Sequence, residues 1–262
     1  MPTAKTEGAN MGQSIITRDA GRYFLTDRIR HEVDWWNTPQ ARGEEPPPVQ
    51  KPVAPGARVI PLPPPAAWGI PPCNLADAIA RRESRRRFRA TPLSPEELAF
   101  LLWATQGVRK RLNEAAVLRT VPSAGCRHPF ETYLAILSVT GIEPAVYRYL
   151  PLDHALVLER EVPDLAATVT AAAHGQRFAG EAAVAFAWTA IPARTEWRYA
   201  EASYKVIALD AGHVCQNLYL ACEAIGAGTC AIAAYRQALA DELLGVDGRE
   251  EFTVYLAPVG KV

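Results

Sequence analysis

A run of arginines carries the strongest chemical signal in the sequence. Residues 81–89 read RRESRRRFR, six arginines around Ser84, and the run lies between two predicted helices. Helix ends and guanidinium groups together suit a phosphate, so the pattern predicts an anion site. A solvated basic surface is the alternative interpretation. Nucleic-acid binding is disfavoured, because no aromatic residues interleave with the arginines and the formal net charge is zero.

A loop of small residues is the second chemical feature. Val121–Tyr133 reads VPSAGCRHPFETY. Its two prolines restrict the loop, and Gly125 lets the backbone lie close to a flat ligand. The apolar run Tyr133–Val139 follows directly and predicts a buried strand. A rigid loop that leads into a core strand can present backbone N–H groups to a cofactor, although an ordinary buried turn has the same pattern.

Several established motifs are missing from the sequence. No GxGxxG follows a predicted strand, and there is no HExxH, GxSxG or paired Cys/His spacing. The sequence therefore predicts neither a dinucleotide-binding fold nor a metal site. The five cysteines form no CxxC pair, which is typical of reduced, structural thiols in a cytosolic protein. We expect His213, on an apolar helix, to be a hydrogen-bonded core residue rather than a ligand.

Length and composition are those of a globular protein. A chain of 262 residues, 49% hydrophobic and 21% charged, can bury a full core. No apolar run reaches the ~20 residues that span a bilayer, and the first residues contain no apolar signal core. The sequence therefore predicts a cytoplasmic protein with neither a membrane nor a nucleic-acid partner.

The chain divides into an N-terminal extension, residues 1–73, and a folded domain, residues 74–262. We expect a loose tail up to about residue 20 and a short helix within Ala20–Trp36. Between Pro39 and Pro72 lie 12 of the 22 prolines, which exclude a helix and a central strand. We expect this segment to be an extended arm on the main domain or on a partner subunit; a disordered linker is the alternative.

The domain mixes helices with short strands around one sheet, which predicts an α+β fold. Asn74 is the expected N-cap of a helix to Arg82, and Ser94, Pro95 and Glu97 form the capping box of the next. Hydrophobic periodicity then predicts further elements. The expected strands are Tyr133–Val139, Ala145–Leu150, Ala155–Glu159, Ala182–Ile191, Thr229–Tyr235 and Glu251–Val259. The expected helices are Pro163–Gln176, Trp197–Ile225 and Gln237–Leu244.

Four motifs in this order resemble the FMN-dependent nitroreductase superfamily. They are RRESRRRF (81–88), PSAGxxxPxExY (122–133), DAGHVCQNLYLA (210–221) and GTCAIAAY (228–235). The SagB-type branch, which includes azoline dehydrogenases of modified-peptide biosynthesis, is the most similar. The resemblance covers about Asn74 to Val262. It implies a nitroreductase-like fold, a central and mostly antiparallel sheet flanked by helices, with FMN as cofactor and a homodimer as the assembly.

The resemblance also implies roles for individual residues. The first FMN motif, which binds the phosphate, ribityl chain and pyrimidine edge, corresponds to Arg82, Glu83, Ser84 and Arg86. The loop that reaches the flavin from the other subunit corresponds to Pro122, Ser123, Ala124 and Gly125. The segment whose backbone N–H faces flavin N5 corresponds to Ala231, Ile232, Ala233 and Ala234. Gln176 would place an amide near the flavin, and Lys261 would be the C-terminal basic ligand of the phosphate.

Arg198 and Tyr199 are the catalytic candidates, because they stand where azoline dehydrogenases of this branch carry a Lys-Tyr pair. Arginine does not deprotonate in proteins, so Arg198 cannot act as a base. Cys126 also replaces the polar residue that many nitroreductases have after the loop. We therefore expect hydride transfer through flavin N5, in NAD(P)H-dependent reduction of nitro or quinone-like acceptors. The alternatives are oxidation of peptide azolines to azoles and a flavin-holding or partner-binding protein without turnover.

Overall fold

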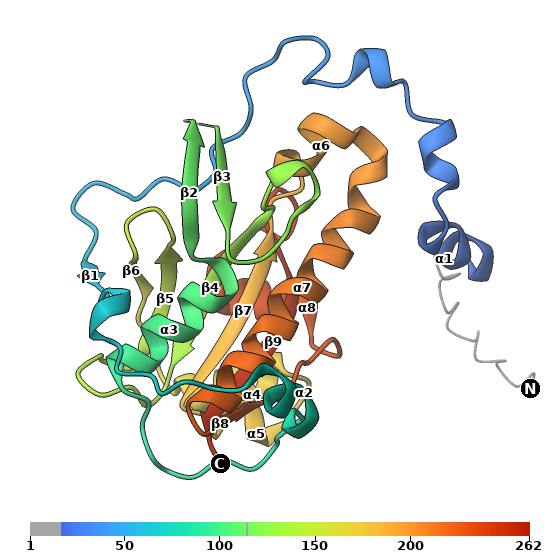
Figure 1. The fold of residues 1–262 in the computed structure, drawn as a ribbon. Helices are drawn as coiled ribbons and strands as arrows, with labels where there is room; N and C mark the ends of the chain where they lie inside the picture. The colour runs from blue at the N-terminus through green and yellow to red at the C-terminus, as the bar shows by residue number, and fades with distance from the viewer. Residues whose placement is uncertain (1–16, 114) are drawn as a thin grey trace, which may run out of the picture.

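The protein is built on an antiparallel sheet with helices on both faces. The computed structural model describes residues 17–113 and 115–262, so most of the predicted loose tail lies outside the described residues. Within the described part, a seven-stranded sheet has the order β1-β6-β5-β4-β7-β9-β8 (Figure 1). All of its strand pairs are antiparallel. The predicted α+β architecture is confirmed.

Seven strands form the main sheet and two form a separate hairpin. The sheet strands are β1 (Val59–Pro61), β4 (Phe130–Ile136), β5 (Ala145–Leu150), β6 (Ala155–Arg160), β7 (Val184–Ala190), β8 (Ala227–Thr229) and β9 (Phe252–Lys261). The hairpin consists of β2 (Val108–Asn113) and β3 (Ala116–Arg119), which project from the body. The hairpin was not predicted, because the sequence VRKRLN has no apolar alternation and is exposed from its second residue onward.

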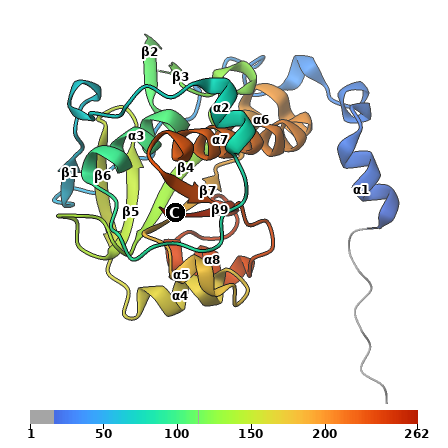
Figure 2. The same cartoon turned by 60° about the horizontal axis from the view of Figure 1, so that its bottom comes forward.

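The helices form one layer on each face of the sheet (Figure 2). One layer contains α2 (Leu75–Arg81), α3 (Pro95–Gln106), α6 (Ala193–Tyr199) and α7 (Ser203–Ala224). The other contains α4 (Leu165–Ala172), α5 (Arg177–Gly180) and α8 (Gln237–Leu244). The predicted caps are confirmed: Asn74 accepts from two backbone N–H groups of α2, and Ser94 with Glu97 forms the capping box of α3. None of the described helices combines the length and apolar composition needed to cross a membrane.

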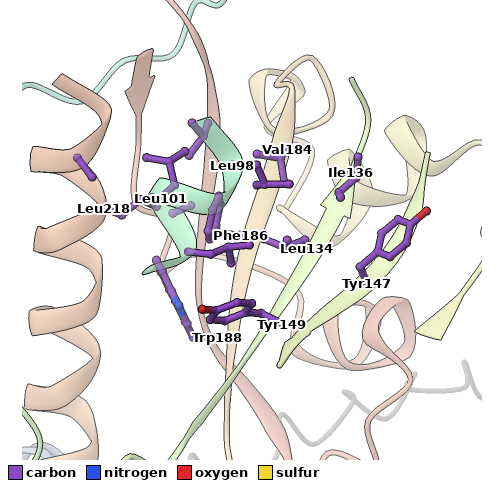
Figure 3. Packing of buried hydrophobic residues seen from close by; sticks show 14 of the residues in the cluster. Leu98, Leu101, Leu134, Ile136, Tyr147, Tyr149, Val184, Phe186, Trp188 and Leu218 are labelled. Atoms are coloured by element: carbon purple, nitrogen blue, oxygen red, sulfur yellow. The ribbon is translucent and has the colours of Figure 1, made fainter. Parts of the chain in front are cut away.

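Alternation along the central strands divides the core in two (Figure 3). In β7, Phe186 and Trp188 are fully buried against the α3 and α7 layer, with Leu98 and Leu218 among their cluster. The intervening alanines belong to the second cluster, under α4 and α8. The strand predicted within Ala182–Ile191 is therefore covered on both faces.

The Pro-rich arm packs on the main domain. Its only strand, β1, lies at the edge of the sheet and pairs with β6, as proline content requires. Leu62 is buried, and Trp68 contacts the rings of Phe100 and Trp103 with centroid distances of 5.6 and 5.4 Å. Apart from a single 3-10 turn at Pro65–Ala67, residues 39–72 contain no helix. Helix α1 (Arg18–Leu25) begins before the predicted Ala20 and extends away from the body.

Two predicted elements were wrong in their extent. The helix predicted from Trp197 to Ile225 is broken between α6 and α7, where Ala200 has φ 44° and ψ −131°. The strand predicted at Thr229–Tyr235 ends at Thr229, and beyond it only Ile232 forms a bridge, to Leu256. Within this stretch the Tyr219 hydroxyl accepts the N–H of Ala231.

Replacing Ala200 with glycine is expected to stabilise the protein. Positive φ with this ψ is the region of a type II′ turn that glycine favours, and such strain costs about 1–3 kcal/mol. Relief of that strain outweighs the entropic cost of a new glycine, about 0.5–1 kcal/mol. Urea unfolding should show a higher midpoint for Ala200→Gly. The same change at the exposed helical Ala167 should lower the midpoint, and equal losses at both positions would contradict the strain at Ala200.

Candidate functional site

Tyr219 of α7 joins two segments of the predicted FMN site. Its hydroxyl lies 3.0 Å from Ser84 Oγ and accepts the backbone N–H of Ala231 at 2.9 Å. The guanidinium of Arg82 lies over the Tyr219 ring, 5.4 Å from the centroid. Ser84 is held in place by a parallel bridge to Thr229. The arginine motif and the 231–234 segment therefore form one site, and their link through Tyr219 was not predicted.

The charges in the arginine motif are unequally available. Arg85 donates to Glu83 across 2.7 Å, and its side chain crosses Gly228 so closely that a Cβ there would lie 2.4 Å from Arg85 Cγ. Arg82 and Arg86, in contrast, pair with no carboxylate of the described residues. Arg82 is half-buried and Arg86 is exposed. Arg87 and Arg89 likewise pair with no described carboxylate, so the motif presents four guanidinium groups to an external anion, while Glu83 is engaged by Arg85.

The 231–234 segment borders an apolar pocket. Ile232 is buried, but Ala233 and Ala234 are exposed. The pocket has a volume of about 410 Å³ and is lined by Tyr204, Ile207, Ala208, Ala211, Gly212, Ala233, Phe252, Val254 and Tyr255. The amide of Gln176 donates to the Ala234 carbonyl at 3.1 Å. Gln176 and this segment are therefore neighbours.

The small-residue loop is fastened to α7 through Asp210. One carboxylate oxygen accepts from Ser123 Oγ at 2.6 Å and from the N–H of Ala124 at 3.3 Å. Burial raises the pKa of Asp210, against the opposing effect of these two hydrogen bonds. The prediction for His213 was wrong: its side chain is 49% exposed, because Asp210 occupies the inward-facing position of the DAGH motif.

A buried histidine fixes the far end of the same loop. The N–H of His128 donates to Ser123 Oγ at 2.9 Å, and its Nε2 lies 3.1 Å from the Val117 carbonyl. Burial, and then the charge of Arg119, lower the pKa of His128 to about 3. His128 is therefore neutral at physiological pH, and its ring supports the loop without titrating.

Gly125 brings the loop against the predicted catalytic pair. It has φ +57°, and a Cβ at this position would lie 2.8 Å from both Arg198 Cδ and the Tyr199 hydroxyl. Only a residue without a side chain allows this approach. Arg198 is exposed, and Pro122 is exposed next to the half-buried Ser123. Loop and pair thus form a second cluster.

The two clusters lie apart within one chain. Asp210, in the loop cluster, and Tyr219, in the arginine cluster, are nine residues apart on α7, or about 14 Å along the helix axis at 1.5 Å per residue. Lys261 does not join the arginine cluster, because its ammonium group is bonded to Glu97 and to the Ile225 carbonyl. The sequence motif DAGHVCQNLYLA contained both helix residues, but periodicity alone could not assign Asp210 or Tyr219 a partner.

The donor set of the arginine cluster fits FMN. The unpaired guanidinium of Arg82 and the hydroxyls of Ser84 and Tyr219 suit a dianionic phosphate. The neighbouring pocket of about 410 Å³ falls within the usual size range of cofactor sites and is lined by aromatic and small side chains, which suit a flat ring.

Comparison with known proteins identifies relatives across most of the chain. The family model for nitroreductases matches residues 79–261. A nitroreductase homologue of Methanocaldococcus jannaschii is 32% identical over 190 residues, 72% of this chain and 91% of the homologue. The trifolitoxin-processing protein TfxB of Rhizobium leguminosarum bv. trifolii is 31% identical over 133 residues, 49% of this chain. The aligned part is 36% of TfxB, so the chain spans well under two thirds of that relative.

Solved structures share the fold. A nitroreductase homologue from Anabaena variabilis ATCC 29413 superposes with a TM-score of 0.67 at 24% identity, over 81% of this chain and 43% of that chain. A chain of the E. coli microcin synthetase McbBCD complex with truncated pro-MccB17 bound superposes with a TM-score of 0.59 at 18% identity. This second likeness covers 95% of this chain and 98% of the other, and so extends into the Pro-rich arm.

Proposed function

The chain belongs to the nitroreductase family, and on that premise we propose that it is an FMN-dependent oxidoreductase that works as a homodimer. The observation that carries the proposal is the arginine cluster: Arg82 and Ser84 meet Tyr219 and Ala231 beside an apolar pocket. In this proposal the phosphate site would lie next to the 231–234 segment, where Ala233 and Ala234 are exposed. Arg82, Ser84 and Arg86 would hold the phosphate and ribityl chain.

A homodimer would complete the site. The loop cluster and the arginine cluster lie on different turns of α7, so one chain does not bring Pro122–Gly125 to Arg82. A second copy packed along α7 would do so, and α7 presents the exposed apolar side chains Tyr204 and Leu209. Burial of such residues is typical of obligate interfaces. We assign the Pro-rich arm and the 74–262 domain to the same functional unit, since the arm packs on that domain.

The bound flavin would supply hydride transfer at N5, and the protein would supply position and electrostatics. Arg86 would stabilise negative charge at the pyrimidine edge. Gln176 orients the 231–234 segment by bonding the Ala234 carbonyl. Tyr199 and Arg198, held against Gly125, would line the substrate side of the site. We propose NAD(P)H as the hydride donor, nitro or quinone-like compounds as acceptors and a cytoplasmic location.

A second candidate is oxidation of azolines in a modified peptide, as in the SagB-type branch. It is favoured by the 31% identity to the trifolitoxin-processing protein and by the full-length fold likeness to a chain of the microcin synthetase complex. Arg198 in place of the lysine of that branch weighs against it. A third candidate is a flavin-holding or partner-binding protein without turnover.

Purified protein is expected to be yellow, to release FMN on heat denaturation and to behave as a dimer in light scattering. Colourless protein that takes up no FMN when it is supplied would remove the cofactor from the proposal. A monomer that still binds FMN would contradict a site shared between two subunits.

Anaerobic addition of NADPH then separates the reactions: bleaching of the flavin supports the reductase. Oxidation of an azoline peptide without bleaching by NADPH supports the second candidate, and neither reaction supports the third.

A further inference from the structure

Arg127, two residues after Gly125, has its guanidinium held in place by the loop cluster. Its Nε donates to the Gly125 carbonyl at 3.0 Å, and its Nη2 reaches the Ala115 carbonyl at 3.5 Å. The guanidinium lies over the Trp197 ring, 4.8 Å from the centroid. Trp197 is itself fixed, because its indole N–H donates to the Glu44 carbonyl at 2.8 Å. The charge is therefore pre-oriented before any ligand binds.

Arg198 packs against the same glycine. An added Cβ on Gly125 would lie 3.0 Å from Arg198 Nε, and the Arg198 guanidinium lies 5.7 Å from the centroid of the Tyr199 ring. Two guanidinium groups thus flank one residue. Burial lowers the pKa of Arg127, and the charge of Arg198 lowers it further, as expected for neighbouring cations.

No described carboxylate neutralises this pair. The ion pairs of the described residues include neither Arg127 nor Arg198. Two close, oriented cations without an anion repel each other, which costs free energy. They favour an external anion, which would receive charge-assisted hydrogen bonds from both.

We propose that Arg127 and Arg198 form a specificity-determining site that binds an anionic group of the substrate beside the Pro122–Gly125 loop. The proposal rests on the proposed flavin function, because that loop is what would place the bound molecule next to the flavin. The ligand chemistry is a carboxylate or a phosphate. A carboxylate would come from an acidic acceptor or an acidic peptide, and a phosphate from a nicotinamide nucleotide.

Calorimetric titration with two matched ligand pairs tests the proposal. The first pair is 4-nitrobenzoate and neutral 4-nitrobenzyl alcohol; the second is NADP⁺ and NAD⁺, which differ by one phosphate. Hydrogen bonds to charged groups predict that the wild-type protein binds the more anionic member of at least one pair about tenfold more tightly. Arg127→Ala and Arg198→Ala should each lose most of that preference. Arg249→Ala, an exposed arginine outside both clusters, should keep it.

The pair that shows the preference identifies its source, carboxylate or phosphate. The proposal is overturned if the wild-type protein shows no preference in either pair, or if the preference survives in both arginine variants. Flavin content, measured on every preparation, keeps this outcome separate from the proposed function. If the protein is yellow but shows no anion preference, only the anion site is contradicted. If the protein is colourless, the flavin function is contradicted, and the titration still decides whether the anion site exists.

Discussion

Arg82→Ala is expected to purify as a folded but largely colourless protein. Arg82 lies at the C-terminal end of α2, over the ring of Tyr219, and pairs with no carboxylate of the described residues. Loss of a hydrogen bond to a charged group costs about 1.5–3 kcal/mol, roughly a tenfold to hundredfold loss of FMN affinity. The ratio of flavin to protein absorbance in the purified variant measures this loss.

Arg81→Ala is the matched control for Arg82→Ala. Arg81 is the preceding residue of the same motif, but it already lies 3.6 Å from a Glu223 carboxylate oxygen and is exposed. It should therefore contribute little to an external phosphate, and its variant should remain yellow. Unchanged circular dichroism would show that both variants are folded. Equal flavin content in the two variants would show that Arg82 does not belong to the site. It would also contradict the functional interpretation of the arginine motif.

The elements that could be predicted from sequence are those with a local signal. The strand that holds Phe186 and Trp188 is almost wholly apolar, and a helix layer covers each of its faces. The N-caps at Asn74 and Ser94 depend only on a side chain and the next three residues. These features hold whatever the rest of the chain does, which is why their positions were right to within a few residues.

The elements that could not be predicted depend on contacts between distant segments. No glycine or proline marks the break at Ala200 in the sequence, and the residues on both sides have helical periodicity. The 231–234 segment is apolar like a strand, but its Ala231 N–H is bonded to Tyr219 of α7, a contact that no local pattern indicates. For the same reason the motifs named the residues of the candidate site, while the pairing of Asp210 with Ser123 appeared only in three dimensions.

The Pro-rich arm contributes to a buried charge cluster at one end of the sheet. Glu131, only 2% exposed, accepts from Arg194 and from the N–H of Lys51, and lies 3.5 Å from Arg148 Nη1. Arg148 in turn donates to the carbonyls of Lys51 and Pro52. Arg119, also buried, donates to the Val49 carbonyl at 2.7 Å. Composition gave no sign of this cluster, because its members come from five separate stretches of sequence.

Glu131→Gln is expected to destabilise the fold by about 3–5 kcal/mol, because it leaves buried guanidinium groups without their counter-charge. Urea unfolding measures the loss. Glu159→Gln is the matched control: Glu159 also bonds Arg148, at 2.7 Å, but is 28% exposed, so its loss should cost about 1 kcal/mol or less. The double variant Glu131→Gln/Arg194→Met should recover part of the stability, since it removes both charges rather than one.

The same carboxylate predicts how stability depends on pH. Burial alone would raise the pKa of Glu131, but the charge and hydrogen bond of Arg194, and then the charge of Arg148, hold the pKa below its ordinary value of 4.5. A carboxyl whose pKa is lowered by folding stabilises the protein above its unfolded pKa, and that contribution disappears as pH falls through the folded pKa. The wild-type protein should therefore lose stability below about pH 4.5, and Glu131→Gln should lose less over the same range. Two results together would show that the buried cluster does not hold the arm and sheet together. The first is equal stability of Glu131→Gln and Glu159→Gln. The second is a pH profile of Glu131→Gln that runs parallel to that of the wild-type protein.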